Sequence, residues 1–368
     1  MSDFNFTVNR GEIVGILGPN GCGKSTLLKT LANILKPIAG TAFIDGKEVF
    51  TMKPVEIAKK MSVMFTERGD VGFLTAFDVV ALGRYPYSDA FGRLSVEDNE
   101  IIMDCLKIVN AEHLANRFFF EMSDGEKQKV LIARALAQEP EVVLMDEPTS
   151  FLDAKHKIEI TLLLRKIASE KNVAIILTTH DIELALRICD RVMLIKDGKI
   201  VCDGFPEEIL TSEVFNEVYN VNSACFETHI GSFEVRGSGN PKVHVVCGSG
   251  TGAKLMRFLT KKNIGFTVGV IHENDIDFVI ANSIANDVVS EKAYQKIQKS
   301  SLKKAIELAE DKIVIDSGFP VGEINEENFE LFKVGKKVVS FRKSDKFKLN
   351  TNVVKVNSLK ELLMEVNS

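Results

Sequence analysis

The sequence lacks paired cysteines, long apolar runs and a large excess of charge. Its six cysteines (Cys22, Cys105, Cys189, Cys202, Cys225 and Cys247) include no C-x-x-C pair, which argues against a zinc site and a disulfide framework. Such cysteine usage is typical of a reducing, intracellular setting. No apolar run approaches the roughly 18 residues that span a bilayer, and the N-terminus shows no signal-peptide pattern. Any role at a membrane is therefore expected to be peripheral.

Charge and length set two further limits. The 368 residues carry a formal net charge of −5, so we expect no nucleic-acid partner and no general attraction to anionic lipid. The chain is 45% hydrophobic and 26% charged, which is an ordinary globular balance. Its length is sufficient for two domains.

A glycine-rich loop at residues 18–26 is the most informative stretch. The apolar run before it predicts a buried strand, and the run after it predicts a helix. The motif G-x-x-x-x-G-K-S is complete, and the loop consists of Gly18, Pro19, Asn20, Gly21, Cys22, Gly23, Lys24, Ser25 and Thr26. In such a loop the backbone N–H groups bind an anion, Lys24 can reach the outer phosphates and the Ser25 hydroxyl can bind Mg²⁺. The pattern predicts nucleoside triphosphate binding; an ordinary glycine-rich turn is the simpler alternative.

Two acids and a histidine follow later apolar strands. Asp146 and Glu147 end the run at 142–147, and His180 follows the run at 173–177. Because side chains alternate along a strand, one carboxylate can hold Mg²⁺ while the other polarises a water for attack on the γ-phosphorus. We expect the two strands to be neighbours in the sheet, so that His180 can reach the same phosphate. Each feature alone is also typical of a solvated strand end or a structural histidine, and the complete phosphate loop favours the catalytic interpretation.

Alternating strand and helix patterns predict an α/β fold with a largely parallel sheet. The first domain is expected at residues 1–230, with a small antiparallel β part and a helical subdomain at about 66–137. Glycine, serine, asparagine and proline at residues 231–241 favour a linker. A smaller Rossmann-like α/β domain is expected at residues 242–368.

Five motifs stand in the order found in ABC-type ATPases. They are the phosphate loop, Met-Ser-Asp-Gly-Glu at 122–126, Asp146-Glu147, Ser-Phe-Leu-Asp at 150–153 and Thr179-His180. Residues 1–215 therefore resemble this family. The resemblance implies ATP and Mg²⁺ as ligands, with Ser25 and Asp146 at the metal, Glu147 as the general base, His180 at the γ-phosphate and Asp153 in the D-loop.

The family resemblance also implies a homodimer whose copies pair head to tail. ATP would lie between the phosphate loop of one copy and the signature residues Ser123, Asp124, Gly125 and Glu126 of the other. The N-terminus of the following helix would offer N–H groups and a positive dipole to the γ-phosphate. Ser123 with Glu126 is also an S-x-x-E capping box, which is a structural reason for the same motif.

The segment at residues 80–87, Val-Ala-Leu-Gly-Arg-Tyr-Pro-Tyr, resembles ATPases of iron-siderophore, haem and cobalamin importers. This implies a membrane permease, an external substrate-binding protein and a location at the cytoplasmic face of the cell membrane. An exposed loop with aromatic residues is the alternative for this segment. Two other functions stay open: an ABC ATPase that works without a permease, and a weakly hydrolysing, nucleotide-gated regulatory protein.

Three departures from the family pattern bear on these expectations. Thr66 stands where the Q-loop glutamine is expected, so the coupling of transport to hydrolysis is in question. No aromatic segment that could stack on adenine stands far enough before Gly11. Asp124 and Glu126 place two acids near the expected phosphate, where they oppose an anion unless they are turned away or hydrogen-bonded.

The C-terminal domain carries a possible dinucleotide turn. Gly248, Gly250 and Ala253 fit G-x-G-x-x-A between an expected strand and an expected helix. Glu273 and Asp275 follow the next strand, about where a ribose-binding acid could lie. A tight turn without a ligand is the favoured interpretation, because this motif is weak by itself. The domain is similar to C-terminal extensions of some archaeal corrinoid-type ABC ATPases.

Overall fold

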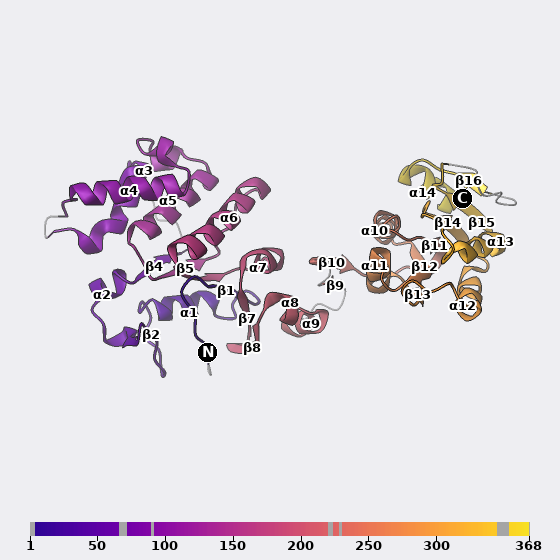
Figure 1. Ribbon diagram of the computed structural model, residues 1–368, viewed down its shortest axis with the longest axis horizontal. Coiled ribbons are helices and arrows are strands. Elements are labelled where there is room, and N and C mark those ends of the chain that lie inside the picture. The colour runs from indigo at the N-terminus through magenta and orange to yellow at the C-terminus, as the bar shows by residue number, and fades with distance from the viewer. Residues whose placement is uncertain are drawn as a thin grey trace. The chain divides into compact units, whose positions relative to one another are not determined.

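The computed structural model describes residues 4–65, 72–89, 92–219, 224–227, 230–343 and 353–367 (Figure 1). The chain divides into two compact units. The first holds residues 1–210 and 217–219, and the second holds residues 211–216 and 220–368. Each unit has its own six-stranded sheet.

The first unit begins with the strand and helix that flank the glycine-rich loop. Its elements are β1 Ile13–Leu17, α1 Lys24–Leu31, β2 Phe43–Ile44, β3 Lys47–Glu48, α2 Pro54–Ala58, β4 Met61–Met64, α3 Ala76–Ala81, α4 Val96–Ile108, α5 Asp124–Ala137, β5 Val142–Asp146, α6 Ala154–Lys171, β6 Ala174–Thr178, α7 Ile182–Ile188, β7 Arg191–Lys196, β8 Lys199–Gly204 and α8 Pro206–Ile209. Short 3₁₀ helices (η1 Val49–Thr51, η2 Leu82–Tyr87, η3 Glu112–Leu114 and η4 Phe119–Glu121) connect some of these elements. The helix α9 Ser212–Tyr219 contains a boundary between the units.

The strand order of this sheet is β4-β5-β6-β1-β7-β8. All neighbouring pairs are parallel except β7 and β8, which confirms the predicted largely parallel sheet. Along β1, β5, β6 and β7, alternate apolar side chains such as Ile16, Leu144 and Ile176 pack against α1 and the β2–β3 hairpin. The carboxyl ends of β1, β5 and β6 therefore meet at one edge, where the three chemical motifs leave the sheet.

Helices α3, α4 and α5 pack together in the region expected to be helical (Figure 1). Three of the helices in the first unit start with a capping box, in which a side-chain oxygen accepts a backbone N–H of the first turn and an acid reaches back: Thr75 with Asp78, Ser95 with Asp98, and Ser123 with Glu126. These caps fix where α3, α4 and α5 begin.

The second unit is a doubly wound sheet. Its elements are β9 Ala224–Glu227, β10 Ser232–Val235, β11 Pro241–Val246, α10 Ala253–Lys261, β12 Gly265–His272, α11 Ile276–Ile284, β13 Asp287–Glu291, α12 Lys299–Ala309, β14 Ile313–Asp316, η5 Glu326–Glu330, α13 Leu331–Val334, β15 Lys337–Ser340, β16 Val353–Lys355 and α14 Leu359–Asn367. The parallel order β13-β12-β11-β14-β15-β16 is the 3-2-1-4-5-6 order of the Rossmann fold. Two apolar clusters on opposite faces join the sheet to α10, α11 and α14 and to α12 and α13.

The linker expected at residues 231–241 is wrong in part, because this stretch contains β10 and the first residue of β11. Strand β10 pairs with β9, and the division between the units falls earlier, within residues 211–220. Two side chains of β10 explain the difference. The Phe233 ring packs on Phe226, with 5.0 Å between ring centroids, and the buried Glu234 carboxylate is paired with Arg257 of α10. The glycines around the strand obscure this short alternating pattern.

Candidate functional site

The glycine-rich loop joins β1 to α1 with three residues in the left-handed region. Gly18, Gly21 and Gly23 have φ values of 150°, 80° and 106°. At Gly18 a Cβ would also approach the Ile195 carbonyl oxygen to 2.2 Å, so this position accepts only glycine. The Lys24 side chain is buried, and its Nζ donates to the carbonyl oxygens of Gly18 (2.8 Å) and Pro19 (3.0 Å). The ammonium group is therefore held against the loop.

Asp146 lies at the end of β5, across from the first turn of α1. The Ser25 hydroxyl donates to Asp146 Oδ1 at 3.1 Å, and the Thr178 hydroxyl donates to the same oxygen at 2.6 Å. Thr178 is fully buried and sits opposite Asp146 in the pairing of β5 with β6. The sequence interpretation placed Ser25 and Asp146 together, and the structure brings their oxygens into hydrogen-bonding contact.

Glu147 is held by contacts that orient its carboxylate. Its backbone has φ 48°, and its N–H donates to the Thr178 hydroxyl at 3.0 Å. The Ser150 hydroxyl donates to Glu147 Oε2 at 2.7 Å, and His180 Nδ1 lies 3.3 Å from Oε1. Burial raises the pKa of Glu147, but the Ser150 hydrogen bond and the neighbouring His180 and Lys24 outweigh burial and lower the pKa below its ordinary value. The carboxylate is thus ionised at neutral pH and able to accept a proton.

The residues expected to do the chemistry therefore gather at one edge of the sheet. His180 is largely exposed beyond β6, and its ring touches Glu147. Asp181, the next residue, caps α7 and is paired with Lys157 of α6. Beside the glycine-rich loop, Lys24 supplies a cation, Ser25 a hydroxyl, Asp146 and Glu147 two carboxylates, and His180 an imidazole. Such groups can bind a triphosphate, hold a divalent cation and activate a water.

The donor atoms at this edge fit a magnesium nucleotide. Mg²⁺ takes oxygen ligands, keeps several waters and needs only one or two protein ligands beside the phosphates. The Ser25 hydroxyl and the Asp146 carboxylate supply oxygens that already lie 3.1 Å apart. Within the described residues, no group of three or more His, Cys, Asp or Glu side chains could hold a metal ion. When bound, Mg²⁺ would neutralise charge on the phosphates.

The signature residues lie at the start of α5 and have partners of their own. Glu126 Oε2 accepts the Ser123 hydroxyl at 2.8 Å, while Oε1 lies 3.3 Å from Arg117 Nη1. The hydrogen bonds from Ser123, together with Arg117, lower the pKa of Glu126 despite burial. The Glu126 charge is thus partly balanced. This acid is hydrogen-bonded, which is one of the conditions under which it would not oppose a nearby phosphate. Thr66, at the expected Q-loop position, lies outside the described residues.

Sequence reasoning missed the hydrogen-bonding roles of Thr178, Ser150 and Gln128. Thr178 and Ser150 orient the two acids, and Gln128 Nε2 of α5 donates to the Pro148 carbonyl oxygen at 2.5 Å. The only sequence signal for Thr178 is its place at the strand end two residues before His180. Nothing local marks Gln128, because its partner lies 20 residues away.

The glycine turn of the second unit does not fit a dinucleotide. The N–H groups of Gly252 and Ala253 donate to the two oxygens of Asp277 at 2.8 Å each, and the Ser249 N–H donates to Asp275 at 2.6 Å. These amides are the groups that would bind a pyrophosphate. Asp277 is fully buried; burial, with a smaller effect of Asp275, raises its pKa despite the backbone hydrogen bonds. The turn is occupied by the protein's own carboxylates.

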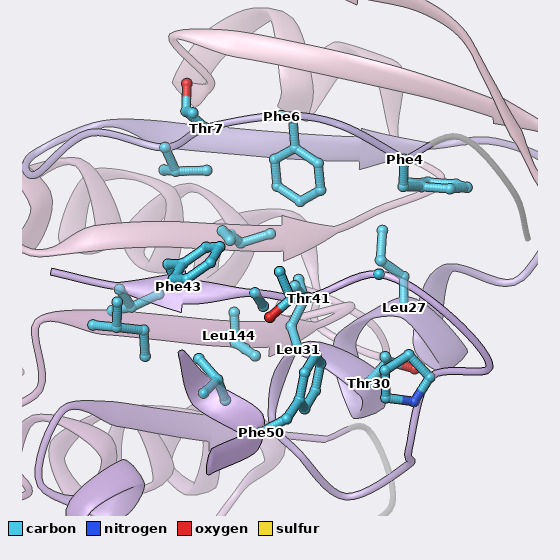
Figure 2. A pocket seen from close by; sticks show the side chains of 18 of the residues that line it. Phe4, Phe6, Thr7, Leu27, Thr30, Leu31, Thr41, Phe43, Phe50 and Leu144 are labelled. Atoms are coloured by element: carbon cyan, nitrogen blue, oxygen red, sulfur yellow. The ribbon is translucent and has the colours of Figure 1, made fainter. Parts of the chain in front are cut away.

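An apolar cavity of about 570 Å³ lies beneath the β2–β3 hairpin of the first unit (Figure 2). Figure 2 shows the rings of Phe4, Phe6, Phe43 and Phe50 around it, with Leu27 and Leu31 of α1. None of residues 18–26, all of which the structure describes, lines this cavity. It is therefore separate from the phosphate loop.

The fold and the site together define a phosphate-loop nucleotide hydrolase. Residues 1–150 match the ABC transporter family, and residues 266–363 match the MJ0874 family. The protein MJ0873 of Methanocaldococcus jannaschii, described as an uncharacterised ABC transporter ATP-binding protein, is 55% identical over 267 residues, covering 72% of this chain and 92% of that protein. The chain belongs to the ABC transporter ATP-binding proteins, and it is an ABC-type ATPase that carries an additional C-terminal domain.

Two further comparisons cover more than half of the chain. The iron(3+)-hydroxamate import ATP-binding protein FhuC of Bacillus subtilis is 35% identical, over 61% of this chain and 83% of that protein. The solved dimeric structure of MJ0796, a bacterial ABC transporter cassette, has a TM-score of 0.50 and 33% identity, covering 56% of this chain and 90% of that one. Among the described residues, no helix has the length and apolar character to cross a bilayer.

We expect the substitution Thr178→Val to lower kcat for ATP hydrolysis about tenfold, which corresponds to about 1.4 kcal/mol. The valine keeps the shape of the buried side chain but removes the hydroxyl that contacts Asp146 Oδ1 and the Glu147 N–H. Both acids then lose a partner that fixes their position. Steady-state phosphate release measures the effect, and Thr178→Ser, which retains the hydroxyl, is the control. A valine variant with wild-type kcat would contradict this role.

Proposed function

We propose that the chain is the ATP-hydrolysing subunit of an importer for an iron complex, with cobalamin as the alternative cargo. Two copies would bind ATP and Mg²⁺ between them at the cytoplasmic face of the cell membrane. They would be attached to a separate permease that receives cargo from an external substrate-binding protein. In each copy Lys24 binds phosphate, Ser25 and Asp146 serve Mg²⁺, Glu147 is the general base and His180 contacts the γ-phosphate.

The observation that carries this proposal is the gathering of Lys24, Ser25, Asp146, Glu147 and His180 at the carboxyl ends of β1, β5 and β6. The signature serine belongs to a different element, the N-terminus of α5. Pairing head to tail would bring the α5 terminus of one copy to the phosphates of the other, where its N–H groups and dipole favour an anion. The likeness to the dimeric cassette MJ0796 supports such a pairing, and the likeness to FhuC supports iron import.

An exposed aromatic cluster supports a protein partner at the helical part. Phe73, Phe118 and Phe120 have ring centroids 5.7–6.3 Å apart and are 81%, 39% and 50% exposed. Exposed apolar side chains that lie together are typical of interaction surfaces, because a partner that covers them removes apolar area from water. We assign the permease to this surface, where it would contact the segments that lead into α3 and α5.

Co-purification from detergent-solubilised membranes tests the proposal. We expect the tagged chain to retain a multi-span membrane protein, and Phe73→Ser to reduce the retained amount roughly fivefold or more. Phe205→Ser is the matched control. Phe205 is also exposed, but it lies at the start of α8 and is not part of the aromatic cluster. ATP binding should be unchanged in both variants. A chain that hydrolyses ATP but retains no membrane protein would instead favour an ABC ATPase that works without a permease.

A further inference from the structure

The first turn of the signature helix α5 lies directly on the ring of His156, in the first turn of α6. A Cβ at Gly125 would come within 2.2 Å of His156 Cδ2 and 2.4 Å of its Cγ. Atoms of neighbouring residues do not approach so closely, so any larger residue at position 125 would displace the ring. The absence of a side chain at Gly125 is what allows the signature turn to rest on this histidine.

The D-loop also contacts this ring, through Asp153. Asp153 Oδ1 accepts the backbone N–H of His156 at 2.9 Å and lies 2.9 Å from the ring atom Nδ1. The hydrogen bond from the His156 backbone, with that from its ring, lowers the pKa of Asp153 against the effect of desolvation, so the carboxylate is ionised. An ionised carboxylate can only accept, and Nδ1 is therefore the donor. The ring is thus oriented by Asp153.

Two further contacts extend this connection. One turn along both helices, Lys129 Nζ of α5 lies 2.6 Å from Glu159 Oε2 of α6, which keeps the helix starts side by side. Toward the N-terminus from Asp153, the D-loop begins at Ser150, whose hydroxyl donates a hydrogen bond to the Glu147 carboxylate. A short chain of contacts therefore runs from the signature turn through His156 and Asp153 to the segment that orients the base.

We propose that His156 is a positioning residue that couples the two ATP sites of the paired protein. The inference rests on the proposed function, because only in a pair does the signature turn of one copy meet the ATP of the other. Binding of that ATP fixes Gly125, and through His156 and Asp153 it fixes the D-loop that orients Glu147 of the same copy. Each copy thereby hydrolyses its own ATP efficiently when its partner's site is also filled.

The test uses the full chain and the ATP dependence of phosphate release. We expect a Hill coefficient of about 2 for the wild type and about 1 for His156→Ala, with kcat lowered about tenfold. Binding of a fluorescent ATP analogue to the phosphate loop should stay within about twofold of wild type, since no loop contact is changed. Lys166→Ala, at an exposed position further along α6 whose ion pair is with Glu170, should match the wild type in every measurement.

Two additional variants separate coupling from a general structural defect. His156→Asn keeps a donor for Asp153 and should recover part of the lost cooperativity. Combining Asp153→Ala with His156→Ala should cost no more than the worse single substitution, because both break the same connection. Additive losses, or a His156→Ala variant as cooperative as the wild type, would overturn the role of His156 and leave the proposed pairing intact. A wild type that is not cooperative and a Glu147→Gln variant that does not dimerise with ATP would instead overturn the pairing, and this inference with it.

Discussion

The substitution Glu147→Gln should reduce ATP turnover at least about 100-fold while leaving ATP binding intact, because general base catalysis contributes on this scale. Glutamine has nearly the same shape, so the contacts to Ser150 and to the Thr178 hydroxyl can persist. What disappears is an ionised carboxylate that can accept a proton from the attacking water. Lys24, Ser25 and Asp146, which bind the phosphates and the metal in our proposal, are unchanged.

Two measurements check this expectation together. Phosphate release should be nearly abolished, and size-exclusion chromatography with ATP and Mg²⁺ should show a stable dimer, because bound ATP is not consumed. Glu183→Gln is the matched control: Glu183 is an exposed acid on α7 that pairs with Arg187 four residues along the helix, and its loss should alter neither measurement. If Glu147→Gln hydrolysed ATP at the wild-type rate, Glu147 would not be the base.

Much of the candidate site at this sheet edge could be predicted from the sequence because its signals are local. The phosphate loop needs glycines at fixed spacing, and the run ending in Asp146 has the length and composition of a buried strand, which the structure shows as β5. The neighbouring positions of β5 and β6 followed from the α/β pattern, and their pairing places Asp146 opposite Thr178. Strand-end residues gather because parallel strands share one carboxyl edge.

The contacts that orient these residues could not be predicted in the same way. Gly125 meets His156 across 31 positions of sequence, and this contact depends on how two helices pack. Asp277 satisfies the glycine turn from 25 residues away, so the motif at 248–253 could not reveal that its amides are already used. The glycines around β10 made this strand hard to predict. Its side chains pack on Phe226 and pair with Arg257, and these contacts, rather than local propensity, stabilise it.

The segment at residues 80–87 is open to two interpretations, and the structure contradicts a loop there, although Tyr85 is exposed as that alternative expects. It forms the end of α3 and the short helix η2, and Arg84 is only 5% exposed. Arg84 Nε donates to Asp98 Oδ1 of α4 at 2.7 Å, while Nη1 donates to the Ala137 carbonyl oxygen at 2.9 Å and to Glu139 Oε2 at 2.7 Å, at the end of α5. The guanidinium also stacks on Tyr87, 4.1 Å from the ring centroid. This arginine joins α4 to the end of the signature helix.

Replacing Arg84 by methionine should destabilise the protein by about 3–5 kcal/mol, the usual cost of removing one partner of a buried ion pair. Asp98 is only 6% exposed and would keep a buried charge without its guanidinium partner. Hydrogen bonds from Ser95, with a further contribution from Arg84, hold the pKa of Asp98 below its ordinary value despite burial, so the acid is charged when Arg84 is removed at neutral pH. The first thermal transition should fall by roughly 10 °C, as measured by calorimetry.

The matched double variant, Arg84→Met with Asp98→Asn, distinguishes the buried charge from simple loss of packing. Asparagine keeps an acceptor for the Ser95 cap but carries no charge, so the double variant should recover at least about half of the lost stability. Arg187→Met, on an exposed i,i+4 pair, should change stability by less than about 0.5 kcal/mol. If Arg84→Met were as stable as Arg187→Met, the segment would not hold α4 against α5. If the double variant recovered nothing, stacking on Tyr87 and contact with Ala137, rather than the ion pair, would carry the stability of this junction.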